Sequence, residues 1–231
     1  MNRINIIGIG FRPLEKKAKE AVLKSDVVLV NERLLETFKD YDEYEAARGK
    51  IKVLKDIYET KAYIRDNYNN QTIALIAVGD PMFFGIGRVI VEEFGKDTME
   101  VYPDLSSVQV AFSRIKEPSS NAFFMSLHGG PDPKKRRKLE YEITELPGLL
   151  QQHGKIAILT DRVNTPQTIA EELLKLPASS RDEVTSPLHD VRMYVCEKLG
   201  YFDEKITEGT PEEIAEISFE HPNVVIIIKT K

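Results

Sequence analysis

The chain has 231 residues, of which 42% are hydrophobic and 30% charged, so it can form two small α/β domains with buried cores. The formal net charge of -5 argues against nucleic-acid binding, and no apolar run approaches the roughly 20 residues of a membrane-spanning helix. The strand-like start predicts no signal peptide, and the single cysteine, Cys196, excludes an internal disulfide or a multi-cysteine zinc site. We therefore expect a cytoplasmic protein that holds no metal and does not contact membranes.

The first half of the chain alternates between strand-like and helix-like segments. Residues 72–78 are apolar almost throughout, which is typical of a strand covered on both faces in a parallel sheet. Leu14, Ala18 and Val22 recur at helical spacing, and Pro13 suits the first turn of that helix. The same reasoning predicts strands over 3–10, 26–30, 51–54, 72–78 and 99–102, and helices that follow residues 13, 85 and 106.

The pattern weakens around residues 115–120, which predicts a linker, and then begins again. Strands are predicted over 123–127, 155–160, 190–196 and 223–229, with helices near 140–152 and between 165 and 177. Thr210 and Glu213 have the spacing of a capping box and predict a short helix. The sequence therefore predicts two α/β domains, residues 1–114 and 121–231.

Ligands of open α/β sheets bind beyond the carboxyl ends of the strands, so the segments after the predicted strands are the candidates for function. Gly8 and Gly10 follow the first strand. Pro13 stands where a dinucleotide-binding fingerprint needs its third glycine, so a nicotinamide site is not expected. This segment is a plain glycine turn or part of a different ligand site.

The segment Gly79–Gly87 is unusual for a mere turn, because two aromatic residues stand between glycines after an aspartate and a proline. Asp80 can cap the following helix, or it can accept hydrogen bonds from a ribose hydroxyl or an amine. Phe83 and Phe84 can belong to the core or cover an apolar ligand. The glycines allow the backbone to approach such a ligand closely.

Polar residues also follow two later strands. Ser106 and Ser107 can cap a helix, or the same helix start can present hydroxyl and N–H groups to a ligand. His128 ends a strand beside glycines, where it is a structural residue or a functional one. The basic run 134–138 is a solvated segment or a patch that meets a polyanion, either RNA or a small molecule with many carboxylates.

Other chemistries lack their motifs. The chain contains no GxSxG nucleophile elbow, no HExxH metal motif and no Walker loop.

At these same segments the sequence resembles the tetrapyrrole methylase family, the class III methyltransferases. Within that family it is most similar to the precorrin or cobalt-precorrin C5-methyltransferases. The resemblance covers nearly the whole chain. It rests on GDPMFFGIG at 79–87, PDLSSVQVAFSR at 103–114, SLHGG at 126–130, AILTDRVNTPQTIA at 157–170, VCEKLGYFDEKITEGT at 195–210 and PNVVIII at 222–228.

The resemblance implies two α/β domains with S-adenosylmethionine in a cleft between them. It places the cofactor against Phe11, Gly79, Asp80, Phe83, Ser106, Ser107, Leu159 and Thr160, with a weaker implication for Cys196. It also leads us to expect substrate contacts from Ser126 and His128. This chain departs from the family pattern at two points: Phe11 replaces the proline of a GxGPG motif, and Asp104 replaces the glycine that usually follows Pro103.

The implied reaction is methylation of C5 of a corrin-ring precursor during cobalamin biosynthesis, by a homodimer. The ring carbon is already nucleophilic and the sulfonium methyl group is activated, so positioning is the main requirement. No catalytic residue is assigned, although His128 is a candidate for contacting the substrate or moving a proton. Since 231 residues accommodate only the C5-methylating half of the fused enzymes, a separate protein is expected to methylate C15 and remove a carboxyl group.

Two alternatives remain open at this point. The same family includes diphthine synthases and an RNA methyltransferase, so the substrate can differ. The chain can also be a non-catalytic subunit that binds the cofactor for a partner. The sequence does not decide whether the corrinoid carries cobalt.

Overall fold

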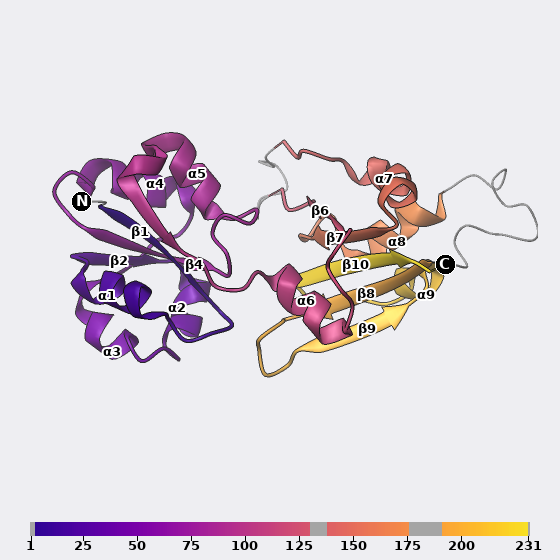
Figure 1. The fold of residues 1–231 in the computed structure, drawn as a ribbon, viewed down its shortest axis with the longest axis horizontal. Helices are drawn as coiled ribbons and strands as arrows, with labels where there is room; N and C mark the ends of the chain where they lie inside the picture. Colours follow the sequence, from indigo (N-terminus) through magenta and orange to yellow (C-terminus); the bar gives the residue numbers. More distant parts are fainter. Residues whose placement is uncertain (1–2, 130–137, 176–190, 231) are drawn as a thin grey trace, which may run out of the picture. The chain divides into compact units, whose positions relative to one another are not determined.

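The computed structural model describes residues 3–129, 138–175 and 191–230, and its contacts divide the chain into two units, 1–106 and 107–231. Each unit is built on a sheet of five strands (Figure 1). Among the described residues, no helix is long and apolar enough to cross a membrane. The predicted basic run 134–138 lies outside the described residues except for Lys138, which is exposed.

The first unit contains a parallel sheet with the strand order β3-β2-β4-β1-β5. Its strands are β1 (Ile4–Ile9), β2 (Val27–Val30), β3 (Ile51–Val53), β4 (Ile73–Val78) and β5 (Met99–Tyr102). Its helices are α1 (Lys16–Lys24), α2 (Glu32–Phe38), α3 (Tyr44–Ala47), α4 (Ile57–Asn67) and α5 (Ile86–Phe94), with 3-10 turns η1 (Arg48–Lys50) and η2 (Lys96–Thr98).

Both faces of this sheet are covered, as the apolar strands predict. Alternate residues of β1 belong to two separate buried clusters: Ile7 packs with residues of α1, α2 and α3, whereas Ile6 packs with Ile64 of α4 and Ile90 of α5. Figure 1 shows the two sets of helices on opposite sides of the strands. Complete burial of one such side chain stabilises the fold by roughly 1.5–3 kcal/mol.

The second unit contains a mixed sheet with the order β6-β7-β10-β8-β9. Its strands are β6 (Phe123–Ser126), β7 (Lys155–Leu159), β8 (Val191–Glu197), β9 (Lys205–Gly209) and β10 (Asn223–Lys229). Its helices are α6 (Ser107–Ile115), α7 (Leu146–His153), α8 (Pro166–Leu174) and α9 (Pro211–Ala215), with the 3-10 turn η3 (Ile143–Glu145). Only the β6–β7 pair is parallel, so the regular alternation predicted from the sequence does not describe this half.

Helices α7, α8 and α9 contribute to one buried cluster with the strands of this sheet. The short helix α9 begins with the predicted capping box, in which Thr210 and Glu213 satisfy each other's backbone N–H groups.

The helix at 107–115 belongs with the second unit. The sequence places it in the first domain, before a linker at 115–120, but α6 packs against β7 and β10. Phe112 of α6 makes an edge-to-face contact with Phe124 of β6, with 6.3 Å between the ring centres. The contact division therefore falls between Ser106 and Ser107, before this helix rather than after it.

Candidate functional site

In the first unit, the loops that follow β1, β4 and β5 meet at the carboxyl edge of the sheet. The N–H of Gly79 donates to the carbonyl of Ile9 at 2.8 Å, and the N–H of Asp104 donates to the carbonyl of Gly79 at 3.1 Å. A Cβ atom on Gly8 would lie 1.9 Å from the Gly79 carbonyl oxygen. The three loops are therefore packed backbone against backbone, which explains the glycines at both positions.

Asp104 fixes the loop that follows β1. Its side chain is 4% exposed, and its Oδ2 accepts hydrogen bonds from the N–H groups of Phe11 at 2.7 Å and Arg12 at 3.2 Å. Its Oδ1 accepts from Nε of Arg12 at 2.8 Å and from the N–H of Leu105 at 2.7 Å. The sequence identified Asp104 only as a departure from the family pattern, and its role became clear from these contacts.

Tyr41 holds the same loop from another side. The N–H of Gly10 donates to the Tyr41 hydroxyl oxygen at 2.7 Å. Burial raises the pKa of Tyr41, and the hydrogen bond from Gly10 opposes this only in part, so the phenol stays protonated at neutral pH. Nothing in the sequence pattern pointed to Tyr41, which lies between α2 and α3.

Asp80 shapes the loop that follows β4. Its Oδ1 accepts a hydrogen bond from the N–H of Met82 at 2.8 Å, and its carbonyl accepts from the N–H of Phe83 at 3.1 Å. Among the described residues, Oδ2 of Asp80 accepts no hydrogen bond, and the residue is only half-buried. Asp80 therefore forms this turn and does not cap the following helix as one alternative from the sequence had it, because the N-cap of α5 is Gly85.

The structure places Phe11, Gly79, Asp80, Phe83 and Ser106 on these three loops. Phe83 and Phe84 are half-buried and pack edge to face, with ring centres 4.9 Å apart. Phe84 has a φ of +54°, an uncommon conformation for a non-glycine residue. Ser106 is buried at the end of the unit, whereas Ser107 begins α6 in the second unit.

In the second unit, Ser126, His128, Leu159 and Thr160 lie together at the ends of β6 and β7. The N–H of Leu127 donates to the carbonyl of Leu159 at 2.9 Å, and Nδ1 of His128 lies 3.3 Å from the carbonyl oxygen of Thr160. A carbonyl oxygen only accepts, so this contact requires a proton on Nδ1 of His128. In the neutral ring, the lone pair that can take up a proton is then on Nε2.

Asp161 holds the loop that carries His128. Its Oδ2 accepts from the N–H of Gly129 at 2.8 Å, and its Oδ1 accepts from the N–H groups of Val163 and Asn164, each at 2.8 Å. The amide nitrogen Nδ2 of Asn164 donates to the carbonyl of Leu127 at 2.7 Å. The sequence singled out neither Asp161 nor Asn164, although both belong to the segment 157–170 that carries the family resemblance.

Two residues implied by the resemblance serve the packing of the second unit. The hydroxyl of Thr160 is buried and donates to the backbone carbonyl and the side-chain oxygen of Asn223, at 2.8 and 2.5 Å. Cys196 is fully buried, and burial raises the pKa of its thiol to about 12. A thiol in this environment stays protonated and unreactive near neutral pH.

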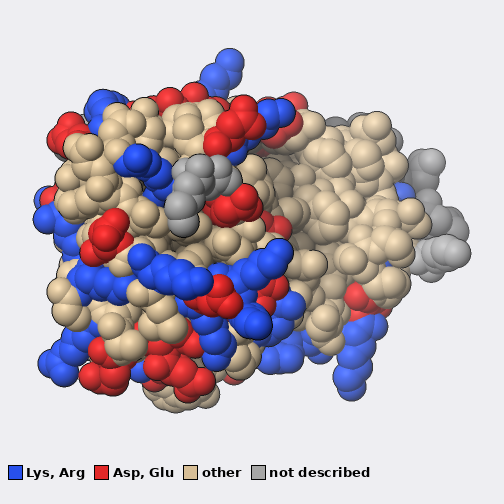
Figure 2. Space-filling model, turned by 60° about the vertical axis from the view of Figure 1, so that its left-hand side comes forward, with Lys and Arg blue, Asp and Glu red and all other residues tan. Residues whose placement is uncertain are grey.

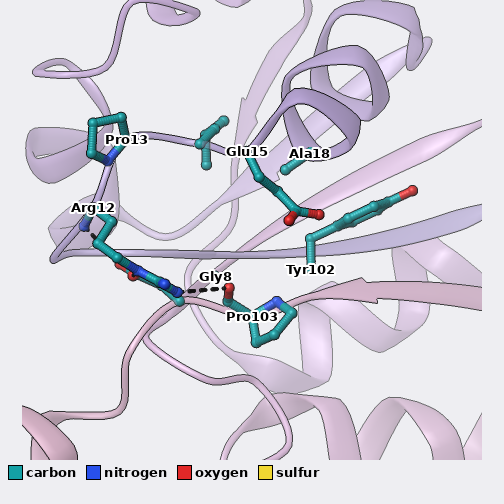
Figure 3. A pocket seen from close by; sticks show the side chains of 9 residues that line it. Gly8, Arg12, Pro13, Glu15, Ala18, Tyr102 and Pro103 are labelled. Carbon is teal, nitrogen blue, oxygen red and sulfur yellow. Dashed lines mark hydrogen bonds and ion pairs between the residues drawn. The ribbon is translucent and has the colours of Figure 1, made fainter.

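A small cavity opens beside the first-unit loops, between the ends of β1 and β5 and the start of α1 (Figure 3). Its volume is about 100 Å³, and its wall includes Gly8, Arg12, Glu15, Tyr102 and Pro103. None of the residues predicted to bind the cofactor or the substrate contributes to this wall.

Comparisons with known proteins agree with this architecture. The chain is 28% identical to a probable cobalt-precorrin-7 C(5)-methyltransferase of Methanocaldococcus jannaschii over 229 residues, which is 96% of each chain. It is 26% identical over 207 residues to a precorrin-6Y C(5,15)-methyltransferase (decarboxylating) of Sinorhizobium; the match covers 88% of this chain but only 44% of that protein.

The fold is shared with a crystal structure of the cobalamin biosynthesis precorrin-6Y methylase of Archaeoglobus fulgidus. The TM-score is 0.68 at 23% identity, and the match covers 100% of this chain and 98% of the other. The model of the tetrapyrrole (corrin/porphyrin) methylase family matches residues 3–215. That match covers the first sheet, strands β6 to β9 of the second sheet and every loop described above, and we conclude that this chain is a member of the tetrapyrrole (corrin/porphyrin) methylase family.

Proposed function

We propose that this protein is an S-adenosylmethionine-dependent methyltransferase that methylates C5 of a precorrin or cobalt-precorrin in cobalamin biosynthesis. The observation that carries the proposal is the similarity to the Methanocaldococcus relative, which is named for this reaction and matches over 96% of both chains. Methyltransferases of this family use S-adenosylmethionine in general. When bound, that cofactor supplies an activated methyl group.

The first-unit loops fit such a cofactor. Gly79 is buried with a φ of +56°, and a Cβ atom there would lie 2.7 Å from the Leu105 carbonyl oxygen, so the turn requires glycine. Oδ2 of Asp80 is suited to accept hydrogen bonds from a ribose hydroxyl or an amine. We propose that Phe11, Gly79, Asp80, Phe83 and Ser106 bind the cofactor. Ser107, Leu159 and Thr160 are proposed as further contacts, on the family resemblance alone.

We assign substrate contacts to Ser126 and His128. The contact between Nδ1 of His128 and the carbonyl oxygen of Thr160 orients the ring, and we propose that His128 contacts the substrate or moves a proton. Because the ring carbon needs little activation, the main contribution of these loops is to hold the reactants in position.

We further propose a homodimer, as the family resemblance implies, and a separate protein for the reaction at C15. The relative matched over 96% of its length is named for C5 alone, whereas the relative named for both positions is matched over only 44% of its length. Light scattering should give twice the chain mass of 26.3 kDa.

Titration calorimetry with S-adenosylmethionine and its demethylated product tests the cofactor. We expect micromolar binding at one site per chain. Asp80→Ala should weaken binding severely, at least tenfold, because it removes both the turn and the free carboxylate oxygen. Asp80→Asn is the matched variant that keeps the acceptor for Met82 but loses the charge. Near-normal affinity of Asp80→Ala would contradict the assignment.

Methyl transfer by the purified protein to a cobalt-free or a cobalt-containing corrin precursor then separates the two routes. If the protein binds the cofactor but methylates neither precursor, its substrate is a different one among those of the family.

A further inference from the structure

The cavity beside the first-unit loops has the size of a side-chain group. Its volume of about 100 Å³ exceeds the ≈ 30 Å³ share of one water molecule but falls below the about 300–1,000 Å³ of whole-ligand pockets. It lies at the carboxyl edge of a parallel sheet, where α/β proteins bind their ligands. An arm of a larger ligand fits this space, whereas a whole tetrapyrrole does not.

Arg12 is oriented at this cavity by two side-chain hydrogen bonds. Its Nε donates to Oδ1 of the buried Asp104 at 2.8 Å, and its Nη2 lies 3.4 Å from the carbonyl oxygen of Pro103, a contact that Figure 3 marks. The Arg12 side chain is nevertheless 53% exposed. Within the described ranges, Nη1 of Arg12 donates to no acceptor, so a planar pair of donors remains for a ligand.

The wall carries charges of both signs: Arg12 is positive, whereas Asp104 and Glu15 are negative, and Glu15 lies near Tyr102 (Figure 3). Asp104 is paired with Arg12, so Glu15 is the carboxylate of the wall that would oppose an acidic ligand, while Lys16 and Lys17 follow it in the chain. The two lysines are exposed in the first turn of α1, at the positive end of its dipole. On the face that Figure 2 brings forward, basic side chains form a band with acidic ones between them.

Arg12 and Asp104 are linked across 92 positions of the chain. The structure joins these two positions in one ion pair. A buried aspartate that orients a half-exposed arginine is an arrangement suited to recognise a second carboxylate.

We propose that Arg12, oriented by Asp104, binds a carboxylate arm of the corrin substrate in this cavity. The inference rests on the proposed function, because the corrin precursors carry several such arms. Arg12 thereby selects an acidic tetrapyrrole and fixes the ring's orientation, while methyl-group chemistry is left to other residues.

Uroporphyrin I, a tetrapyrrole with eight carboxylates, and its octamethyl ester serve as probes in fluorescence titrations of the full chain. Arg12→Gln should weaken uroporphyrin binding about tenfold and leave ester and S-adenosylmethionine binding unchanged. Glu15→Gln, which leaves the Arg12–Asp104 pair intact, should strengthen uroporphyrin binding about threefold. The matched control is Arg65→Gln: Arg65 is similarly exposed, at 59%, and pairs with Glu93 in the same unit.

The outcomes separate this inference from the proposed function. Wild-type affinity for uroporphyrin in Arg12→Gln would overturn the inference, as would equal losses for acid and ester. Unchanged binding in Glu15→Gln would also count against it, and this variant covers the case in which Arg12→Gln fails to fold. A wild-type protein that binds uroporphyrin but not S-adenosylmethionine would contradict the proposed function alone.

Discussion

The two units use the same device at the edges of their sheets. In each, a buried aspartate two residues beyond a strand accepts hydrogen bonds from backbone N–H groups of a neighbouring loop: Asp104 after β5 and Asp161 after β7. They differ in setting. Asp104 also binds a guanidinium group and lies among loops packed backbone to backbone, whereas Asp161 gathers N–H groups from its own loop and from Gly129. At the edge of the first sheet, Asp104 therefore holds loops whose backbones are in close contact. At the edge of the second sheet, Asp161 positions the loop that carries His128.

The largest expected effect tests the close packing of the first edge. Gly8→Ala would place a Cβ atom 1.9 Å from the Gly79 carbonyl oxygen and 2.7 Å from the Asp104 nitrogen. Both are main-chain atoms, which cannot move away without disturbing the hydrogen bonds between the loops. The free energy of unfolding, measured in urea, should fall by about 3 kcal/mol or more. Gly148→Ala, in α7 with nothing within 4 Å, is the control and should raise it by about 0.5–1 kcal/mol. A Gly8→Ala variant as stable as wild type would remove this difference between the edges.

The second edge is tested through Asp161. Asp161→Ala leaves the N–H groups of Gly129, Val163 and Asn164 without this acceptor, so stability should fall by about 2–3 kcal/mol. Asp161→Asn keeps an acceptor oxygen and should lose about half as much. Because the loop carries His128, kcat should fall in both variants by a larger factor than the affinity for S-adenosylmethionine, to which the neighbouring Leu159 and Thr160 are proposed to contribute. A loss of cofactor affinity with unchanged kcat would reverse the roles given to the two edges.

The ionisation of the buried Cys196 thiol tests the stability of the second unit alone. Its pKa of about 12 in the folded state exceeds the value of about 8.5 in an unfolded chain. The thiol therefore ionises at a lower pH in the unfolded state than in the folded state. The free energy of unfolding that the buried thiol contributes is complete below pH 8.5 and is lost as the pH rises toward 12, by up to about 1.4 kcal/mol per pH unit. Urea titrations of wild type and Cys196→Ala from pH 8 to 10.5 should diverge in this direction; parallel curves would show that the thiol is not buried.

Substitutions at helix caps have the smallest expected effects on stability, and they test whether the two units unfold together. Asn31 caps α2 in the first unit through the N–H of Leu34, and Thr210 caps α9 in the second. Each alanine variant should cost about 1 kcal/mol. If the units unfold independently, Asn31→Ala should leave the rate of Cys196 labelling unchanged, while Thr210→Ala should increase it about fivefold. Equal increases in both variants would show one cooperative transition.

The sequence predicted the first sheet well, because its three inner strands, β1, β2 and β4, are almost entirely buried and read as near-continuous apolar runs. It missed α2, α3 and α4, because α2 and α3 are only 7 and 4 residues long and α4 buries only Thr60 and Ile64, so none of them shows a long apolar face. The predicted strand at 190–196 was found as β8, but β9 was not predicted: its residues Lys205, Ile206 and Glu208 are exposed, as edge-strand residues often are, and leave no apolar alternation.

Of the candidate site, the sequence predicted the loops but not what fixes them. Loops after strands can be located from glycines and strand ends alone. Asp104, Tyr41 and Asp161 act on residues 31 to 93 positions away or across a turn, and such contacts depend on which strands become neighbours. Local patterns do not contain that information, and the antiparallel pairing of β10 with both of its neighbours was equally invisible.

The central position of β10 has a consequence for synthesis on the ribosome. Strand β10 lies between β7 and β8 and is the last of the described strands to be translated. Until residues 223–229 leave the exit tunnel, the second sheet has a gap through which β7 and β8 expose unpaired edges. The first unit, whose sheet is complete once residue 102 has emerged, can fold much earlier. Nascent chains should therefore hold a folded first unit beside an open second sheet, and this interval is when chaperones have most to protect.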